Sequence, residues 1–281
     1  MELFHMEVFN PIIRDRGEFM VKLDNIRDIV LPLGLVVDQE ETTIDIQGTC
    51  FIFNPLPDLR DVQYFITAKH CVFPYKSNEI GKADNTTIMF RYFDPNDQVD
   101  FHYWSRREMR QTFKIDWSEV GGYDLALIPN YSPKCMNKER GIIVHRHYSK
   151  ISQIKQGSVH LLGYPKRGHC NLLDLETIHP IKLNGTIKGT HIKEFIIKIE
   201  VPSGQYGLSQ MDGLSGGPVI GYNNGIPYII GVAVEQYGTE IIAHSLDPIL
   251  TYLACVNKKL KREEEFSRRI SVFEHECTND R

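Results

Sequence analysis

The stretch DGLSGGPV at residues 212–219 places a serine inside a glycine-rich loop that runs into a β-like segment. A serine hydroxyl is a weak nucleophile at neutral pH and needs a base within hydrogen-bond reach. Gly213 permits an unusual backbone conformation that aims its N–H inward, beside the N–H of Ser215. Each such donor to a developing oxyanion is worth about 2.7–4 kcal/mol. The loop therefore predicts a nucleophile at Ser215, with Gly216 and Gly217 keeping side chains away from a substrate.

Two other segments supply the partners that such a serine needs. YFITAKHC at residues 64–71 is a β-like run that ends in His70, and an imidazole pKa of about 6.5 suits proton transfer at neutral pH. YDLALI at residues 123–128 carries Asp124 at the start of a β-like run, and a carboxylate that holds Nδ1 fixes the tautomer of the ring. Each segment alone is explained as well by a turn, a structural histidine or a strand-edge aspartate. Together, in the order His…Asp…Ser, they predict a catalytic constellation.

Short runs rich in Ile, Val, Phe, Tyr and Thr follow one another from about residue 42 to residue 234. Glycine, proline, asparagine and aspartate separate these runs, and the NNG sequence at residues 223–225 is typical of a hairpin turn. No long helical pattern lies between them, so the sequence predicts an all-β sandwich or barrel. After it, apolar residues recur at helical spacing, and Asp247-Pro248 is a suitable helix start. These apolar residues are Ile249, Leu253, Val256 and Leu260.

Three motifs resemble those of the trypsin-like serine peptidases of the chymotrypsin fold: TAKHC at residues 67–71, YDLAL at 123–127 and GLSGGP at 213–218. Their chain order is similar to the order in that family and differs from the subtilisin and α/β-hydrolase orders. GTCF at residues 48–51 resembles the hairpin ahead of the histidine strand. GVAV at residues 231–234 resembles the strand that lines the substrate cleft.

The resemblance covers about residues 42–258 and implies a peptidase domain of two antiparallel six-stranded β-barrels with a C-terminal helix. The barrels are expected at about residues 42–130 and 131–246, with the active site between them. The resemblance also implies a role for each motif residue, and it implies no cofactor. The expected roles are Ser215 as nucleophile, His70 as general base and then acid, Asp124 as the orienting carboxylate, and Gly213 with Ser215 as oxyanion-hole donors.

One departure from the family pattern concerns activation. Leu214 stands where secreted trypsins carry the aspartate that pairs with a freed N-terminal amine. The Ile-Val-Gly-Gly start of those enzymes is not visible either, so we do not expect maturation by that route. In this respect the chain is similar to the intracellular or HtrA-like bacterial branch, although no PDZ domain is expected after residue 258.

A second departure concerns specificity. Ser209 stands where trypsin carries the aspartate of its pocket floor, so a strict preference for Lys or Arg is not expected. The other residues expected to bind substrate are Val234, Glu235, Gln236 and His244. Glu235 is expected to favour basic groups and Gln236 to narrow the pocket. His244 is expected to reach the pocket wall and to favour an acidic P1 side chain.

Composition excludes some other classes of protein. The 281 residues include 32 Lys and Arg against 36 Asp and Glu, so the basic excess typical of a nucleic-acid binder is missing. The longest apolar run, residues 29–37, is interrupted by Pro32 and Gly34 and falls short of the roughly 20 residues of a membrane helix. The N-terminus does not resemble a signal peptide. The sequence therefore predicts a soluble cytoplasmic protein that binds neither nucleic acid nor membrane.

The cysteines and the remaining histidines give weaker indications. The six cysteines form no CxxC pair and are expected to be free thiols, and Cys50 with Cys71 is the one candidate pair for a disulfide. Neither His145-Arg146-His147 nor His169-Cys170 has the spacing of a metal site, so no metal is expected.

Two hypotheses of function follow. The first is a serine endopeptidase that cleaves a protein or peptide substrate through an acyl-enzyme. A regulatory protein partner would act on the N-terminal segment, residues 1–41, whose structure the sequence leaves open, or on the charged extension, residues 259–281, predicted to be helical. That extension is explained equally by a helix that packs on its own domain. The second hypothesis is a catalytically silent trypsin-fold binding or regulatory module, which Leu214 and Gln236 would favour if they distorted the oxyanion loop or the pocket.

Overall fold

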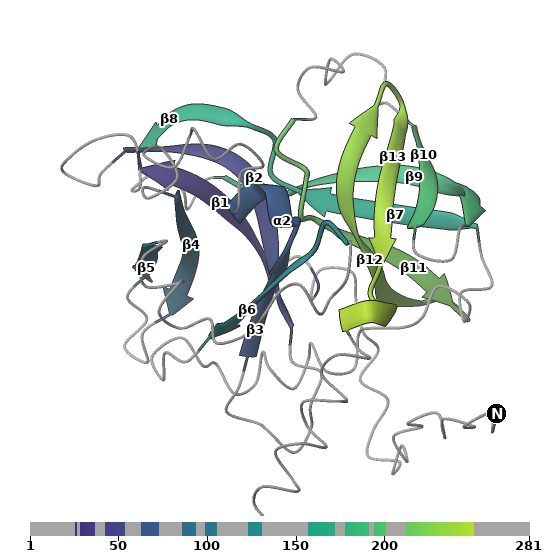
Figure 1. Ribbon diagram of the computed structural model, residues 1–281, viewed down its shortest axis with the longest axis horizontal. Coiled ribbons are helices and arrows are strands. Elements are labelled where there is room, and N and C mark those ends of the chain that lie inside the picture. The colour runs from purple at the N-terminus through teal and green to yellow at the C-terminus, as the bar shows by residue number, and fades with distance from the viewer. Residues whose placement is uncertain are drawn as a thin grey trace, which may run out of the picture.

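The structure, a computed structural model, consists mainly of β-strands arranged in two adjacent units (Figure 1). It describes residues 26, 29–36, 43–53, 63–72, 86–93, 99–105, 123–130, 157–171, 178–190, 194–200 and 212–249. Of the helices in these ranges, none has the length and apolar character needed to cross a membrane. The all-β prediction is confirmed.

The first unit is a seven-stranded sheet with the order β5-β4-β1-β2-β3-β6, in which β8 also pairs with β2. Its strands are β1 (Val30–Val36), β2 (Thr43–Phe53), β3 (Gln63–Thr67), β4 (Thr86–Phe93), β5 (Val99–Ser105), β6 (Ala126–Asn130) and β8 (Arg167–Asn171). The predicted six-stranded barrel is therefore not what this unit shows, because the strand path stays open within the described residues. Two of its strands also come from outside residues 42–130, since β1 precedes that range and β8 follows it.

β1 is a strand although a proline and a glycine interrupt its apolar run. Pro32 pairs with Thr49 of β2, whereas the pairing of β1 with β4 begins one residue later, at Leu33. Proline is tolerated at such an end of a ladder because few hydrogen bonds depend on its missing N–H. The β1–β2 register shifts between Leu33 and Gly34, and glycine suits an irregular backbone of this kind.

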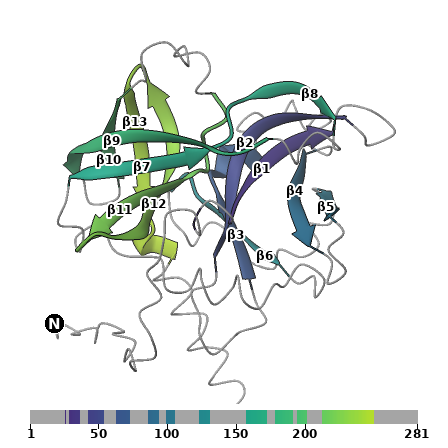
Figure 2. The same cartoon turned by 180° about the vertical axis from the view of Figure 1, so that it is seen from behind.

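The second unit is a closed barrel of six strands with the order β10-β13-β12-β11-β7-β9 (Figure 2). Its strands are β7 (Ser158–Gly163), β9 (Ile181–Thr190), β10 (Glu194–Glu200), β11 (Pro218–Asn223), β12 (Ile226–Tyr237) and β13 (Glu240–Ser245). Asn224 and Gly225, between β11 and β12, both have positive φ values of 53° and 80°. A two-residue turn of this geometry follows the twist of its strands, so the hairpin predicted at residues 223–225 is confirmed.

A shared hydrophobic core joins the two units. Phe51, Phe53 and Phe65 of the first sheet are at most 1% exposed and belong to the same cluster as Leu162 and Ile229 of the barrel. A second cluster, which includes Val159, Leu161, Leu183, Val219 and Ile230, belongs to the barrel strands. Burial of apolar surface on this scale is the main favourable term in folding. The shared cluster therefore holds β2 and β3 of the first sheet against the barrel. Residues 212–217 lie directly before the barrel strand β11.

The predicted C-terminal helix is described only over its first turn, residues 247–249. The hydroxyl of Ser245 accepts the N–H of Asp247 at 3.1 Å, so Ser245 caps this turn in place of the predicted Asp247. Ile249 is 1% exposed and belongs to the shared core. The other positions of the predicted helical face, and the charged extension at residues 259–281, lie outside the described residues.

Candidate active site

His70 lies just after β3, in the short helix α2 (Lys69–Val72), which sits where the two units meet (Figure 1). The apolar strand β3 is buried from Tyr64 onward, and the chain leaves the core just after its end. Lys69 and His70 therefore lie at the edge of the core. The N–H of Lys69 donates to the carbonyl oxygen of Asp124 at 3.2 Å, which ties the start of α2 to the segment before β6. The side chain of His70 is 31% exposed.

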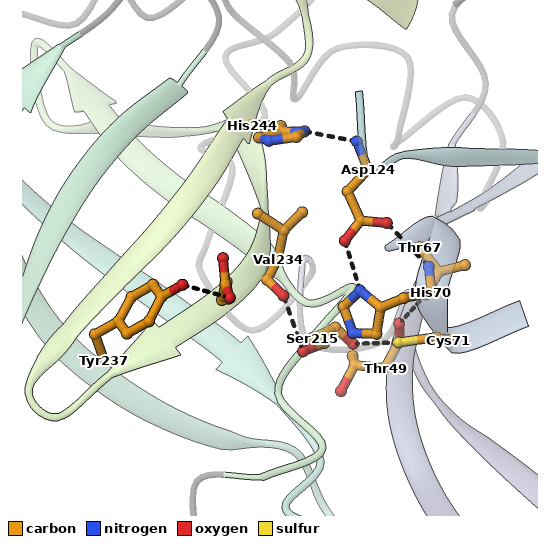
Figure 3. Close-up of polar contacts among 10 residues, drawn as sticks. Thr49, Thr67, His70, Cys71, Asp124, Ser215, Val234, Tyr237 and His244 are labelled. Atoms are coloured by element: carbon orange, nitrogen blue, oxygen red, sulfur yellow. Dashed lines mark hydrogen bonds and ion pairs between the residues drawn. The ribbon is translucent and has the colours of Figure 1, made fainter. Parts of the chain in front are cut away.

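The carboxylate of Asp124 holds His70 at two points. Its Oδ1 accepts the backbone N–H of His70 at 2.9 Å, and its Oδ2 lies 2.5 Å from the ring nitrogen Nδ1 (Figure 3). The carboxylate thus favours the proton on Nδ1 and leaves Nε2 as the nitrogen able to exchange a proton. Two residues 54 positions apart in the chain are thus brought together.

The surroundings of the imidazole strengthen it as a base. Burial opposes its protonation, but the hydrogen bonds and charges of Asp124 and Cys71 outweigh burial and raise the pKa of His70 from 6.5 to about 10. Nearby, burial raises the pKa of the Cys50 thiol above its ordinary value. Cys50 and Cys71 are free thiols, so no disulfide joins them.

Ser215 lies in the loop that precedes β11, at the same junction (Figure 3). Its carbonyl oxygen accepts the backbone N–H of Thr49 at 2.9 Å and lies 3.6 Å from the thiol sulfur of Cys71, the neighbour of His70. Its hydroxyl donates to the carbonyl oxygen of Val234 at 3.3 Å. A hydroxyl has one proton to donate, so in this conformation that proton goes to Val234 and not to His70.

The loop around Ser215 is held in an unusual conformation. Gly213 has a φ of 92° and Gly216 a φ of 89°, a region that side chains rarely permit. The carbonyl of Gly213 accepts the hydroxyl of Thr49 at 3.0 Å, and the carbonyl of Asp212 accepts the N–H of Lys166. The predicted need for glycine at position 213 is confirmed.

Gly216 and Gly217 serve a purpose other than the predicted one. A Cβ at Gly216 would lie 1.9 Å from the carbonyl oxygen of Thr49 and 2.2 Å from the hydroxyl of Thr67. A Cβ at Gly217 would lie 2.2 Å from the carbonyl oxygen of Leu162. These atoms belong to the protein and not to the space beside Ser215. The two glycines therefore let the loop approach the backbones of both units.

Thr49 is the functional residue that the sequence analysis missed. Its hydroxyl donates to Gly213 and accepts the backbone N–H of Tyr164 at 2.8 Å, while its own carbonyl accepts the hydroxyl of Thr67 at 2.7 Å. It is fully buried in β2. Thr49 thus joins β2, β3 and the barrel at one point. The GTCF motif at residues 48–51 contains Thr49, but a single threonine within a strand carries no spacing signal that predicts this role.

The predicted substrate-binding residues fall into three groups. Ser209 lies outside the described residues. Val234 is buried, and beyond it Glu235 is exposed, with its carboxylate accepting the hydroxyl of Tyr237 at 2.6 Å. The amide of Gln236 donates to the carbonyl of Gly238 at 2.9 Å.

His244 lies on β13, whereas Val234, Glu235 and Gln236 lie on β12. It is 5% exposed, and it lies opposite Val232 in the pairing of β12 with β13. Its Nδ1 accepts the backbone N–H of Asp124 at 3.1 Å. The structure therefore brings His244 to the backbone of Asp124, the residue predicted to orient His70.

No metal site is found within the described ranges, in which no three His, Cys, Asp or Glu side chains are placed to hold one ion. His145 and His147 lie outside those ranges. His169 and Cys170 lie on β8.

No family model matches the chain, and no curated protein matches it. Among solved structures it is similar to the Rv3671c protease of M. tuberculosis in its active form, at 15% identity and a TM-score of 0.41, over 82% of each chain. The inactive form gives 15% identity and a TM-score of 0.41, over 84% of this chain and 89% of the other. A Glu endopeptidase gives 14% identity and a TM-score of 0.41, over 86% of this chain and 99% of the other. Likeness at this level assigns no role to any residue of this chain.

Proposed function

We propose that this protein is a serine endopeptidase that hydrolyses peptide bonds through an acyl-enzyme. The observation that carries the proposal is the double hold of Asp124 on His70, at 2.9 Å and 2.5 Å, at the point where the Ser215 loop docks on β2. A carboxylate that grips both the backbone and Nδ1 of one histidine leaves Nε2 directed away from it. That nitrogen is then the general base for the nearby hydroxyl.

In the first half-reaction the Ser215 side chain leaves the carbonyl of Val234 by rotating about its Cα–Cβ bond. Its oxygen then attacks the carbonyl carbon of the scissile peptide bond, and its proton passes to Nε2 of His70. The N–H groups of Gly213 and Ser215 are the proposed donors to the oxyanion, because φ at Gly213 allows the loop to turn its N–H inward. His70 returns the proton to the leaving amine as the C–N bond breaks.

The second half-reaction releases the acyl group. Water loses a proton to the neutral His70 and attacks the ester carbon, and His70 returns that proton to the Ser215 oxygen as the C–O bond to Ser215 breaks. Asp124 keeps its negative charge throughout and stabilises the imidazolium that forms twice in the cycle. We further propose a cytoplasmic enzyme of the HtrA-like branch, restrained by a regulatory protein that acts on residues 1–41 or 259–281.

Peptide-library cleavage tests the proposal. The wild-type protein and Ser215→Ala are incubated with the same mixture of peptides, and new termini are identified by mass spectrometry. Cleavage by the wild type that Ser215→Ala lacks supports the proposal and gives the P1 preference. A wild-type protein with no cleavage above the level of Ser215→Ala, with or without a cell extract as a source of activator, rejects it.

The alternative is a catalytically silent module of the same fold. The hydrogen bond from the Ser215 hydroxyl to the carbonyl of Val234 favours this alternative, since the hydroxyl proton then has an acceptor other than a catalytic base. A silent module would retain its binding partner intact and would bind it equally well as Ser215→Ala. An endopeptidase would cleave that partner unless Ser215 is replaced.

A further inference from the structure

His244 is a buried histidine that is expected, from the sequence, to reach the wall of the substrate pocket. It lies on β13, opposite Val232 of β12 and Glu194 of β10. Its ring stands edge-on to Tyr123, with centroids 5.8 Å apart and planes at 81°. Figure 3 shows it on the far side of Asp124 from His70. In this position the ring faces the peptide backbone at Asp124.

The hydrogen bond with Asp124 indicates which ring nitrogen of His244 carries the proton. The N–H of Asp124 donates to Nδ1 of His244 at 3.1 Å. A ring nitrogen accepts a hydrogen bond only when it carries no proton, so the proton of the neutral His244 lies on Nε2. An amide donor at a largely buried position costs free energy when it loses its acceptor.

Asp124 thus contacts two histidines, one through its side chain and the other through its backbone. Its carboxylate holds His70 in the first unit, and its N–H is held by His244 in the barrel. Asp124 lies before β6 in a segment without regular structure, so strand pairing does not hold it there. The bond to His244 adds a restraint from the unit that also carries Ser215.

We propose that His244 is a positioning residue that fixes Asp124, and through it His70, relative to the barrel that bears Ser215. This inference rests on the proposed function for its catalytic consequence. His244 then acts through the backbone of Asp124 and touches no substrate, in place of the role in P1 selection that the sequence suggested.

Two variants separate this role from simple packing. In His244→Asn the side-chain oxygen stands near the position of Nδ1 and can accept the Asp124 N–H. In His244→Gln the oxygen stands near the position of Nε2, so the acceptor is displaced although size and polarity are retained. His160→Gln, on β7, is the matched control, because His160 is a partly buried histidine whose ring contact is with Tyr222.

The first readout is the pKa of His70, measured by NMR titration of the ring nitrogens, which does not require activity. We expect a lower pKa in His244→Gln than in the wild type, because a displaced Asp124 stabilises the imidazolium less, and a restored value in His244→Asn. The second readout is cleavage of the best library peptide. We expect His244→Gln to lower kcat about tenfold with KM unchanged, and His244→Asn to stay within about threefold of the wild type.

An unchanged pKa of His70 in His244→Gln overturns the inference, even if the protein cleaves no peptide. A change in KM confined to peptides with an acidic P1 residue also overturns it, in favour of a pocket role. A wild-type protein without Ser215-dependent cleavage rejects the proposed function alone, and the NMR titration still decides the role of His244. Thermal unfolding of each variant confirms that it is folded before either readout.

Discussion

The backbone N–H of Thr49 donates to the carbonyl oxygen of Ser215 at 2.9 Å, so β2 of the first sheet holds the loop that carries the proposed nucleophile. The side chain of Thr49 adds a second link, to the carbonyl of Gly213 at 3.0 Å. The N–H and the hydroxyl of Thr49 are both buried, where water competes least for their hydrogen bonds. The distance between His70 and Ser215 therefore depends on one threonine that belongs to neither of their segments.

Thr49→Val should destabilise the protein. Valine has nearly the same shape but lacks the hydroxyl, so the N–H of Tyr164 and the carbonyl of Gly213 both lose their partner. Leaving a buried polar group unpaired costs roughly 1–3 kcal/mol in free energy of unfolding. Urea unfolding measures this loss, and Thr49→Ser, which retains the hydroxyl, should recover most of it. A Thr49→Val protein as stable as the wild type would contradict the linking role.

Gly216→Ala should be far more damaging than an alanine at another glycine with positive φ. At Gly216 the new Cβ would collide with the carbonyl of Thr49 at 1.9 Å, whereas at Gly225, with φ of 80°, nothing lies within 4 Å. We expect Gly225→Ala to cost about 1–2 kcal/mol from backbone strain alone. Gly216→Ala should cost at least about 2 kcal/mol more, because overpacking adds to the strain. Equal losses of unfolding free energy would show that the loop does not approach β2 this closely.

The ion pair of His70 with Asp124 should make stability depend on pH in one direction. The folded pKa of His70, about 10, is above its ordinary value of 6.5, so folding is favoured by protonation. The stabilising contribution is complete below pH 6.5 and is lost as pH rises from 6.5 to about 10. The difference in unfolding free energy between the wild type and His70→Gln should therefore shrink over that range. A difference that stays constant or grows with pH would refute the pairing.

Cys71→Ala should move the acid limb of the pH–rate profile to lower pH. Burial lowers the pKa of His70, while Asp124 and Cys71 raise it, so removing the thiol removes one of the raising influences. His70 must be neutral to accept a proton, and a lower pKa leaves more of it neutral at pH 7. We expect kcat/KM at neutral pH to rise relative to the wild type. Cys170→Ala, which removes the side chain of a cysteine on β8, should leave the profile unchanged.

The candidate site residues could be predicted from the sequence because each stands at an unusual position beside a β-like run. His70 follows a buried apolar strand and Asp124 precedes another, so a polar group stands at the edge of a core in both cases. The glycines beside Ser215 were visible because a run of small residues interrupts β-like sequence. Their purpose was misjudged, since a close approach to Thr49 or Leu162 depends on strands more than 50 positions away.

Other features depend on pairing that no local pattern contains. β1 holds Pro32 and Gly34 and becomes a strand because β2 and β4 flank it. β8 completes the first sheet from the second half of the chain, so a division into two consecutive barrels did not foresee it. His244 stands between Ala243 and Ser245 on β13, and only the tertiary contact with Asp124 favours the proposed positioning role over a pocket role.

The most direct test of the central claim is the intact mass of the protein after reaction with a fluorophosphonate, which phosphonylates an activated serine. We predict one adduct on the wild type, none on Ser215→Ala, and strongly slowed labelling of His70→Ala, because the hydroxyl then has no base. An adduct that persists in Ser215→Ala, or a wild-type protein that remains unlabelled both with and without a cell extract as a source of activator, would contradict the account.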